Sequence, residues 1–470
     1  MSAVATNPGR ARTTDWRGFF EDPFTLRTVL VLLGGHALLG LLAKSAPIIA
    51  TMHGAIVIGA LLIMAFLGRR LDRIVALTVY ASLGDLFWRM TRSQVPWEIS
   101  KYLLIVGSCS ILIRFARPWS RPGVPMAYLA CLVPGIFITV MSYGPWVSRA
   151  FIADFGLGAI AIGFAVLAFR QLQMSEAEAW NLGWVMLSAI MPALAITTRS
   201  SLKLGISAFN GESNFAATGG YGPNQVSSAL GLGILLCVLL GLQRRGPRYL
   251  ALLCGLGIWL TWADLVTFSR GGMYTVVLAG GAMLLVGMRT RSHRLRSTVT
   301  LAVAVIGLLM VYTSVNDFTG NWLEVRYSGG SRASATTGRS DLAEQDLQIF
   351  STHPIWGVGV GGSDRFHRLA GHVDPATHTE QARFLAEHGV FGLVAIGLLI
   401  AMAVEGYRAS RSQWNQLFCV ATFGWGFATM LHAATRLGAV SLLIALSQVR
   451  IDLDARVSRH RGATADAAQA

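Results

Sequence analysis

Apolar runs long enough to cross a bilayer recur from one end of this 470-residue chain to the other. The hydrocarbon core of a membrane takes about 20 apolar residues of helix to span, and a helix satisfies its own backbone polar groups there. Hydrophobic residues make up 53% of the sequence and charged residues only 13%. We therefore expect an all-α polytopic membrane protein with about 12–14 transmembrane helices. The expected spans lie near residues 27–43, 47–67, 74–88, 99–113, 124–142, 151–169, 182–198, 223–242, 248–267, 272–288, 298–315, 383–403, 414–431 and 436–449.

Arginine clusters between the spans predict the orientation of the chain, because short cytoplasmic loops retain positive charge. Counted alternately, the clusters fall on one side together with both termini. They include Arg69, Arg70 and Arg73; Arg114, Arg117 and Arg121; Arg244, Arg245 and Arg248; and Arg289, Arg291, Arg294 and Arg296. We expect cytoplasmic tails at residues 1–26 and 450–470, eleven helices over 27–315, more over 383–449, and a periplasmic loop with a short amphipathic helix at 316–382. The shorter loops near 200–222 and 268–271 face the same side as that loop.

The net charge of +15 follows from this topological bias and from attraction to anionic lipid, so we expect no nucleic-acid partner. Lys44 and Pro47 spoil the small-residue pattern that follows a cleaved signal peptide, so the first span is expected to stay as a helix. The five cysteines lie in or beside apolar runs at unrelated spacings, which indicates small packing residues rather than disulfides or a zinc site.

The loop over 316–382 is far longer than an ordinary connection, which is typical of a functional segment. Ser340 is a candidate cap for a helix that runs to about Ser351 and ends before Pro354. A glycine-rich stretch follows at residues 354–362. It has no Gly-Lys-Ser/Thr ending and no preceding strand, so a phosphate loop is disfavoured there.

Histidines and carboxylates gather where the chain re-enters the membrane, over residues 371–383. A histidine at this place can take a proton from a hydroxyl near neutral pH. Two alternatives remain open from the residues alone. His372, Asp374, His378 and Glu380 could bind a metal, although their spacing is not a recognised zinc pattern. The histidine could also simply cap the next helix.

Two arginines sit at outward helix ends, against the positive-inside trend. Arg270 lies in Thr-Phe-Ser-Arg-Gly-Gly between two spans, and Arg199 closes an earlier span. Each could extend to lipid headgroups, but guanidinium also binds phosphate oxygens in a bidentate way. Asn224 opens the span that follows Arg199, and asparagine is a preferred helix N-cap residue. Together they predict an anion site at the outer face.

Three stretches resemble the O-antigen ligase and O-antigen polymerase superfamily of bacterial envelope glycosyltransferases. They are residues 268–272 (Phe-Ser-Arg-Gly-Gly), residues 338–359 with His-Pro-Ile-Trp-Gly-Val-Gly at their end, and residues 378–392, which begin His-Thr-Glu. Their order and their place on an outward loop match the family as well. The N-terminal half resembles it only in being a row of apolar spans.

The resemblance implies a GT-C-like enzyme of the bacterial inner membrane that needs no metal or other cofactor. Its donor would be a glycan on undecaprenyl diphosphate and its acceptor a sugar hydroxyl. Arg270, and more weakly Arg199, would bind the diphosphate, and His378 would act as base. Many members have Asn after the histidine, whereas Thr379 and Glu380 stand here. Glu380 could therefore orient His378, act as base itself or recognise a sugar; candidate contacts to acceptor or sugar are Asn224, Arg339 and Arg383.

A polymerase and a ligase differ only in the acceptor, which is a growing lipid-linked chain for one and lipid A core for the other. The His-Thr-Glu variant favours a polymerase of surface or exopolysaccharide slightly. A transporter or flippase of a lipid-linked anion would need charges in the middle of several spans, and Asp85, Asp154 and Asp264 lie near span ends. A scaffold without activity would tolerate replacement of Arg270 and His378.

Overall fold

A computed structural model of the chain describes residues 22–115, 122–243, 245–289, 291–328, 339–369, 379–433 and 435–452. The first helices are α1 (Leu26–Ser45), α2 (Pro47–Phe66), α3 (Leu71–Met90), α4 (Ile99–Arg114), α5 (Gly123–Phe151), α6 (Leu157–Phe169), α7 (Glu176–Ser201) and α8 (Pro223–Gly241). The others are α9 (Pro247–Val266), α10 (Arg270–Met288), α11 (Arg291–Phe318), α12 (Trp322–Ser328), α13 (Arg339–Thr352), α14 (Gly362–Leu369), α15 (Glu380–His388), α16 (Val390–Ala409), α17 (Gln413–Thr429) and α18 (Gly438–Leu446). Short elements complete the fold: β1 (Gln173–Ser175), β2 (Arg450–Asp452), η1 (Ile152–Gly156) and η2 (Ile206–Ala208).

The described residues confirm an all-α polytopic membrane protein. Nine of their helical stretches are long and apolar enough to cross a membrane. The sheet in the described part of the chain consists of two strands of three residues each. Burial separates these spans into inner and outer ones: 94% of the apolar span of α7 is buried in the protein, compared with 11% for α11. Helix α7 is thus a central element, and α11 offers most of its apolar surface to lipid.

Local sequence sets many helix ends. Prolines begin α2, α8 and α9, where a missing backbone N–H costs nothing. Ser175 and Glu178 form a capping box at the start of α7, and Ser412 accepts a hydrogen bond from the Asn415 N–H at the start of α17.

The prediction of one continuous span over 383–403 is wrong, because this region consists of two helices, α15 and α16. The break falls at Gly389, whose φ is 61°. A side chain at this position would meet the Ile355 carbonyl oxygen at 2.5 Å, so both the backbone angle and the close packing require glycine. The helix expected between Ser340 and Ser351 is confirmed as α13.

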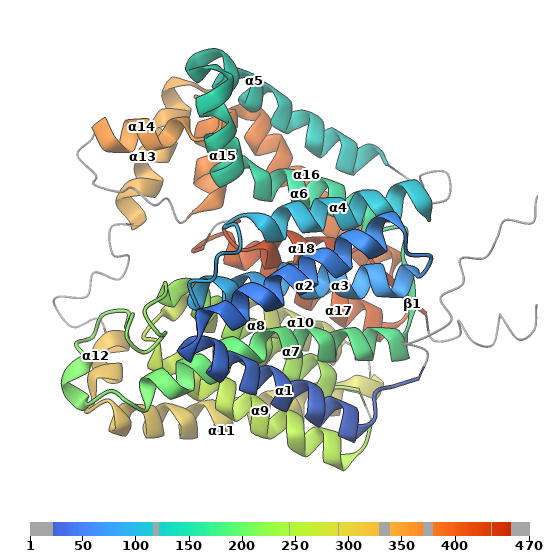
Figure 1. Cartoon of the computed structure of the whole chain (residues 1–470), viewed down its shortest axis with the longest axis vertical. Coiled ribbons are helices and arrows are strands. Elements are labelled where there is room, and N and C mark those ends of the chain that lie inside the picture. The colour runs from blue at the N-terminus through green and yellow to red at the C-terminus, as the bar shows by residue number, and fades with distance from the viewer. Residues whose placement is uncertain are drawn as a thin grey trace, which may run out of the picture.

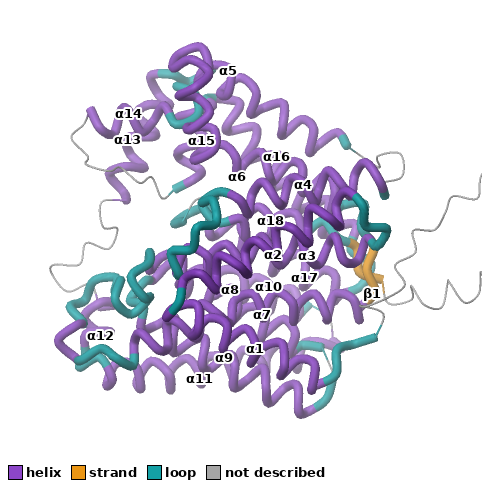
Figure 2. The backbone as a smooth tube through the Cα atoms, in the orientation of Figure 1, coloured by secondary structure: helices purple, strands orange, loops and turns teal. Residues whose placement is uncertain are grey.

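The long helices lie side by side, and α10 packs against both α8 and α17 (Figure 1). Helix α12 lies at the lower left of Figure 1 and helices α13 and α14 lie at the upper left, and Figure 2 shows several longer loops on the same side. We call this the loop end of the bundle. Strand β1 lies at the opposite end.

Contacts between segments far apart in the sequence sort into the same two ends. At the end opposite the loop end, β1 pairs in parallel with β2, and Arg170 forms an ion pair with Glu405 at 2.7 Å. Both contacts join segments predicted to be cytoplasmic. At the loop end, Lys44 donates a hydrogen bond to the Gly219 carbonyl at 2.6 Å, which joins two loops predicted to face outward. Each of these contacts joins loops that were predicted to lie on the same side of the membrane, which agrees with the predicted alternation of the loops. Which end of the bundle faces the cytoplasm stays a prediction.

Candidate active site

The chain reverses between α9 and α10 in a tight turn that ends at Arg270. Phe268 in this turn has a φ of 57°, a left-handed angle that is costly for a residue with a side chain. Its ring is buried and stacks on Phe209, with ring centroids 5.4 Å apart. The Thr267 hydroxyl donates to the Asp264 carbonyl at 2.7 Å and closes the end of α9. Packing therefore holds a strained backbone turn next to Arg270. Strained backbone of this kind is often found at functional sites.

Arg270 is the first residue of α10 and is half-buried. Its position at a helix N-terminus places it beside backbone N–H groups and the positive end of the helix dipole. Its guanidinium acts electrostatically on Arg326 and Tyr327 of α12. Burial, and then the charge of Arg270, lower the pKa of Arg326. A guanidinium at a helix N-terminus, with the charge of a second one nearby, favours an anion beside it.

Arg326 was not identified from the sequence, and it joins helix α12 to two loops at the loop end. Its Nε donates to the Phe268 carbonyl at 3.0 Å, and its two Nη atoms donate to the Gly211 carbonyl and the Ser213 hydroxyl, each at 3.2 Å. The side chain is only about 4% exposed. It fixes the strained turn from behind, and no spacing in the sequence marks it out from other loop arginines.

Helix α8 lies unusually close to the start of α10. The Gly272 N–H donates to the Ser227 hydroxyl at 3.0 Å, and that hydroxyl donates to the Ser269 carbonyl at 3.0 Å. A side chain at Gly272 would lie 2.1 Å from the Ser227 carbonyl oxygen. The two glycines after Arg270 therefore allow α8 and α10 to approach, which is a packing reason for that motif.

Asn224 connects this pair of helices to a segment that the sequence gave no reason to select, the turn between α17 and α18. Its Nδ2 donates to the His432 carbonyl, and its Oδ1 lies 3.1 Å from His432 Nδ1. The other ring nitrogen of His432 lies 2.7 Å from the Thr275 hydroxyl of α10.

Glu380 and Arg383 form a buried ion pair at 2.6 Å at the start of α15. Both Glu380 carboxylate oxygens are occupied, since Oε1 also accepts from the Thr435 hydroxyl at 2.8 Å and Oε2 from the Thr435 N–H at 3.3 Å. Arg383 donates to the Phe155 carbonyl at 2.9 Å and lies over the Phe155 ring. Both side chains are thus committed to contacts within the protein.

The helices around this pair carry further buried charge. Asp346 of α13 lies 3.0 Å from His367 of α14, and burial raises the pKa of Asp346. Glu387 of α15 accepts hydrogen bonds from the Gly361 N–H at 2.8 Å and the Ser363 hydroxyl at 3.1 Å. Burial raises the pKa of Glu387 to about 7, although Arg383 opposes the shift. These groups join α13, α14 and α15 into one unit.

The glycine-rich stretch at 354–362 packs against α15. The Val358 and Gly359 N–H groups donate to the Ala386 and Glu387 carbonyls, both at 3.0 Å. Gly357, Gly359 and Gly361 all have positive φ. The stretch is therefore a packed turn whose N–H groups are used inside the protein, which agrees with the rejection of a phosphate loop.

Arg199 lies in a different pocket at the loop end. It donates to the Leu41 carbonyl at 3.1 Å and the Ser45 hydroxyl at 3.0 Å, both at the end of α1. The pocket has a volume of about 410 Å³ and is lined by Lys44, Ser45, Arg199, Ser200, Lys203 and Ala216. Its three cations make it a second place for an anion, and Arg270 is not among its lining residues.

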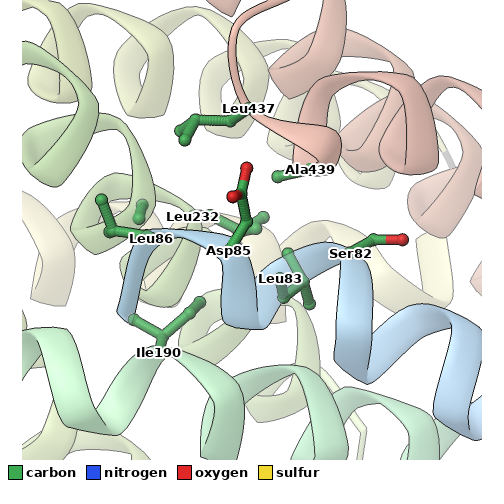
Figure 3. A pocket seen from close by; sticks show the side chains of 9 residues that line it. Ser82, Leu83, Asp85, Leu86, Ile190, Leu232, Leu437 and Ala439 are labelled. Atoms are coloured by element: carbon green, nitrogen blue, oxygen red, sulfur yellow. The ribbon is translucent and has the colours of Figure 1, made fainter. Parts of the chain in front are cut away.

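Asp85 points into a small cavity between α3, α7, α8 and the start of α18 (Figure 3). The cavity is about 10 Å³, which is room for no more than one water. The carboxylate is paired with Arg89 at 2.8 Å. Asp85 is therefore a buried ion-pair partner, and this cavity is too small to be a passage for a substrate.

The predicted site residues fall into three groups. The described residues of the turn over 430–435 contact Asn224, the backbone beside Arg270, and Glu380 with its partner Arg383. Arg199 lies in the pocket beside α1. His378 lies outside the described residues, and Arg339 begins α13 with a side chain that is likewise not described. The residue after His378, Thr379, contacts the Leu431 carbonyl through its hydroxyl at 3.5 Å.

The four-ligand metal hypothesis falls largely outside what the structure describes, since His372, Asp374 and His378 all lie in the undescribed segment 370–378. Among the described residues, no group of three or more His, Cys, Asp or Glu side chains could hold a metal ion. Glu380, the described member, is paired with Arg383.

Residues 255–397 match the family described as O-antigen ligase. The matched segment runs from within α9 to within α16 and contains Arg270, Arg326, Glu380 and Arg383. Arg199, Asn224 and His432 lie outside it. No curated protein and no solved structure matches the chain.

Proposed function

We propose, from the match of residues 255–397 to the family described as O-antigen ligase, that the chain is a member of the O-antigen ligase and polymerase superfamily, and from that premise we propose its reaction in detail. It is a membrane glycosyltransferase of this type. The proposed donor is a glycan on undecaprenyl diphosphate, the acceptor is a sugar hydroxyl, and the loop end faces the periplasm from the bacterial inner membrane. Both termini are then cytoplasmic.

The observation that carries the proposal is the position of Arg270 at the N-terminus of α10 with Arg326 behind it. A diphosphate placed there meets a half-buried guanidinium and the positive end of a helix dipole. These groups are fixed before the reaction, so they stabilise charge that develops on a leaving diphosphate without reorganising. The polyprenyl tail can lie along the apolar faces of the spans while the sugars stay in water.

The bond changes follow from this placement. The acceptor hydroxyl oxygen attacks the anomeric carbon of the donor, the bond from that carbon to the phosphate oxygen breaks, and undecaprenyl diphosphate leaves with the electron pair. The hydroxyl proton passes to a base. Arg270 holds the leaving group, and no metal takes part in the proposed step.

We assign the base to His378 and a positioning role to Glu380. Glu380 is fully buried, pairs with Arg383 and accepts hydrogen bonds from Thr435 at both carboxylate oxygens, so burial and these partners shield it from an acceptor hydroxyl. The same pair fixes the start of α15, to which Thr379 and His378 are joined. Arg383, about 5% exposed, also suits this supporting role better than a sugar contact.

The pocket around Arg199 supports a second anionic contact at the same end of the bundle. Lys44, Arg199 and Lys203 line it together, so it would hold a phosphate or another anionic group of a lipid-linked glycan. The slight preference for polymerase over ligase rests on the His-Thr-Glu sequence at 378–380.

The test is transfer by the full chain in lipid nanodiscs, supplied with an undecaprenyl-diphosphate oligosaccharide with and without EDTA. A ladder of longer lipid-linked glycans identifies a polymerase, and transfer only after addition of lipid A core identifies a ligase. His378→Ala and Arg270→Ala should each abolish transfer, whereas Arg365→Ala, an exposed arginine of α14, should not. Activity that survives both substitutions would overturn the site, and absence of transfer to either acceptor would overturn the function.

A further inference from the structure

The turn between α17 and α18 contacts both arms of the proposed site, although it lies outside the segment that matches the family. One arm is the start of α10, which carries Arg270. The other is the start of α15, which follows His378. We name residues 430–435 the bridging turn; residue 434 within it is not described.

On the α10 side, the contact is made by His432. Its Nε2 lies 2.7 Å from the Thr275 hydroxyl, and that hydroxyl lies 2.9 Å from the Gly271 carbonyl, one turn back in α10. A side chain at Gly271 would lie 2.5 Å from His432 Nδ1, so the imidazole rests directly on the backbone next to Arg270. The ring therefore supports the first turn of α10 from the side of α17.

The same imidazole also holds α8. Its Nδ1 lies 3.1 Å from Asn224 Oδ1, and the His432 carbonyl accepts from Asn224 Nδ2. The amide orientation of Asn224 is set by this second bond, so Oδ1 is the acceptor and His432 Nδ1 carries the proton. The ring thus has a defined donor at Nδ1 and a hydroxyl partner at Nε2.

On the α15 side, the bridging turn binds the backbone and side chain of Glu380. The Glu380 N–H donates to the Met430 carbonyl at 2.8 Å, and the Thr435 hydroxyl donates to Glu380 Oε1 at 2.8 Å. The contact of Thr379 with Leu431 lies between them. A few residues therefore hold the start of α15 on one side and the start of α10 on the other.

From this juxtaposition we infer that His432 is a positioning residue for the proposed transfer. It fixes the distance between the arginine that grips the donor diphosphate and the segment that presents the acceptor base. This inference rests on the proposed function. It adds a residue from beyond the matched segment, and it assigns that residue an effect on alignment in the transition state rather than on donor binding.

The expected effect is on kcat. A misplacement of about 1 Å between reacting groups costs about 100-fold in rate, while Arg270 can still grip the donor in the ground state. His432→Ala should lower kcat about 100-fold and change KM for the donor less than about threefold. His432→Gln can replace the Nε2 contact to Thr275, and His432→Asn the Nδ1 contact to Asn224, so at least one should restore part of the rate.

The experiment compares these three variants and His353→Ala with the wild type in nanodiscs, using the lipid-linked oligosaccharide as donor. His353 is an exposed histidine on the same end and serves as the control. Unchanged kcat in folded His432→Ala protein, or a rise in KM with kcat preserved, would overturn the inference.

Hydrogen exchange on the same variants tests the bridge without turnover. In His432→Ala, backbone amides of residues 270–276 and of 380–383 should exchange faster together, while His353→Ala should leave both segments as in the wild type. Faster exchange at 270–276 alone would contradict a bridge between the arms. If the wild type transfers no glycan, the proposed function fails, and these exchange rates still decide whether His432 couples the two segments.

Discussion

Gly272→Ala is the substitution whose effect can be worked out most directly from the packing of α8 against α10. The new Cβ would lie 2.1 Å from the Ser227 carbonyl oxygen and 2.5 Å from its carbonyl carbon. Non-bonded heavy atoms rest about 3.5 Å apart, and the atoms in the way are backbone, so one helix must move by about 1 Å. Overpacking of this kind costs about 1–3 kcal/mol.

Two further contributions to the free energy of unfolding cancel each other. The hydrogen bond from the Gly272 N–H to the Ser227 hydroxyl would be lost, at about 1 kcal/mol, and alanine gains about 1 kcal/mol over glycine in a helix. The net expectation is a loss of about 1–3 kcal/mol in the free energy of unfolding. Transfer activity should fall by more than this loss of folded protein explains, because the shift displaces the turn that carries Arg270.

The assay is unfolding in mixed detergent micelles with increasing SDS, with transfer measured on the folded fraction. Gly281→Ala is the matched control in the same helix. The Cβ added at Gly281 would have no neighbouring atom within 4 Å. That variant should be as stable as the wild type or up to about 1 kcal/mol more stable. Equal stability and activity of Gly272→Ala and Gly281→Ala would refute the close approach of α8 and α10.

The remaining predictions concern buried charges at the loop end. Arg326→Gln should release the loop over 205–222, since it removes charge-assisted hydrogen bonds worth about 3 kcal/mol or more together, and faster hydrogen exchange in that loop would show it. Glu380→Gln should destabilise the protein by about 3–5 kcal/mol because it leaves Arg383 buried without its carboxylate; a stable, inactive variant would instead favour Glu380 as the base. Glu387, whose pKa burial raises from 4.5 to about 7, binds its proton more tightly in the folded state, so the free energy of unfolding should fall by up to about 3 kcal/mol as pH rises through that range. Glu387→Gln should remove this part of the pH dependence, and an unchanged slope would contradict it.

The membrane fold could be predicted because its signal is long and redundant. Each span of about 20 apolar residues is visible alone, and the arginine clusters order the loops between them. The split at Gly389 was missed because an apolar run gives no sign that its first turns belong to a separate buried helix. Only the packing of Gly389 against Ile355 shows why the backbone must turn there.

Arg270 could be selected from the sequence because its charge stands out against an apolar background, and its role in binding stays a prediction. Glu380 and Arg383 also stood out, but their pairing with each other depends on the helical spacing and burial of α15, which the sequence does not give. His432 carries no such signal. It becomes notable only because the fold brings α17 back against α8 and α10, more than 150 residues from either contact.

The central claim is that Arg270 grips a lipid-linked diphosphate, and binding of undecaprenyl diphosphate to the purified protein in nanodiscs tests it most directly. The loss of a charge-assisted hydrogen bond is worth about 1.5–3 kcal/mol, so Arg270→Gln should weaken binding about 10- to 100-fold. Arg365→Gln, on the exposed face of α14, should leave it unchanged. Wild-type affinity in Arg270→Gln would contradict the account.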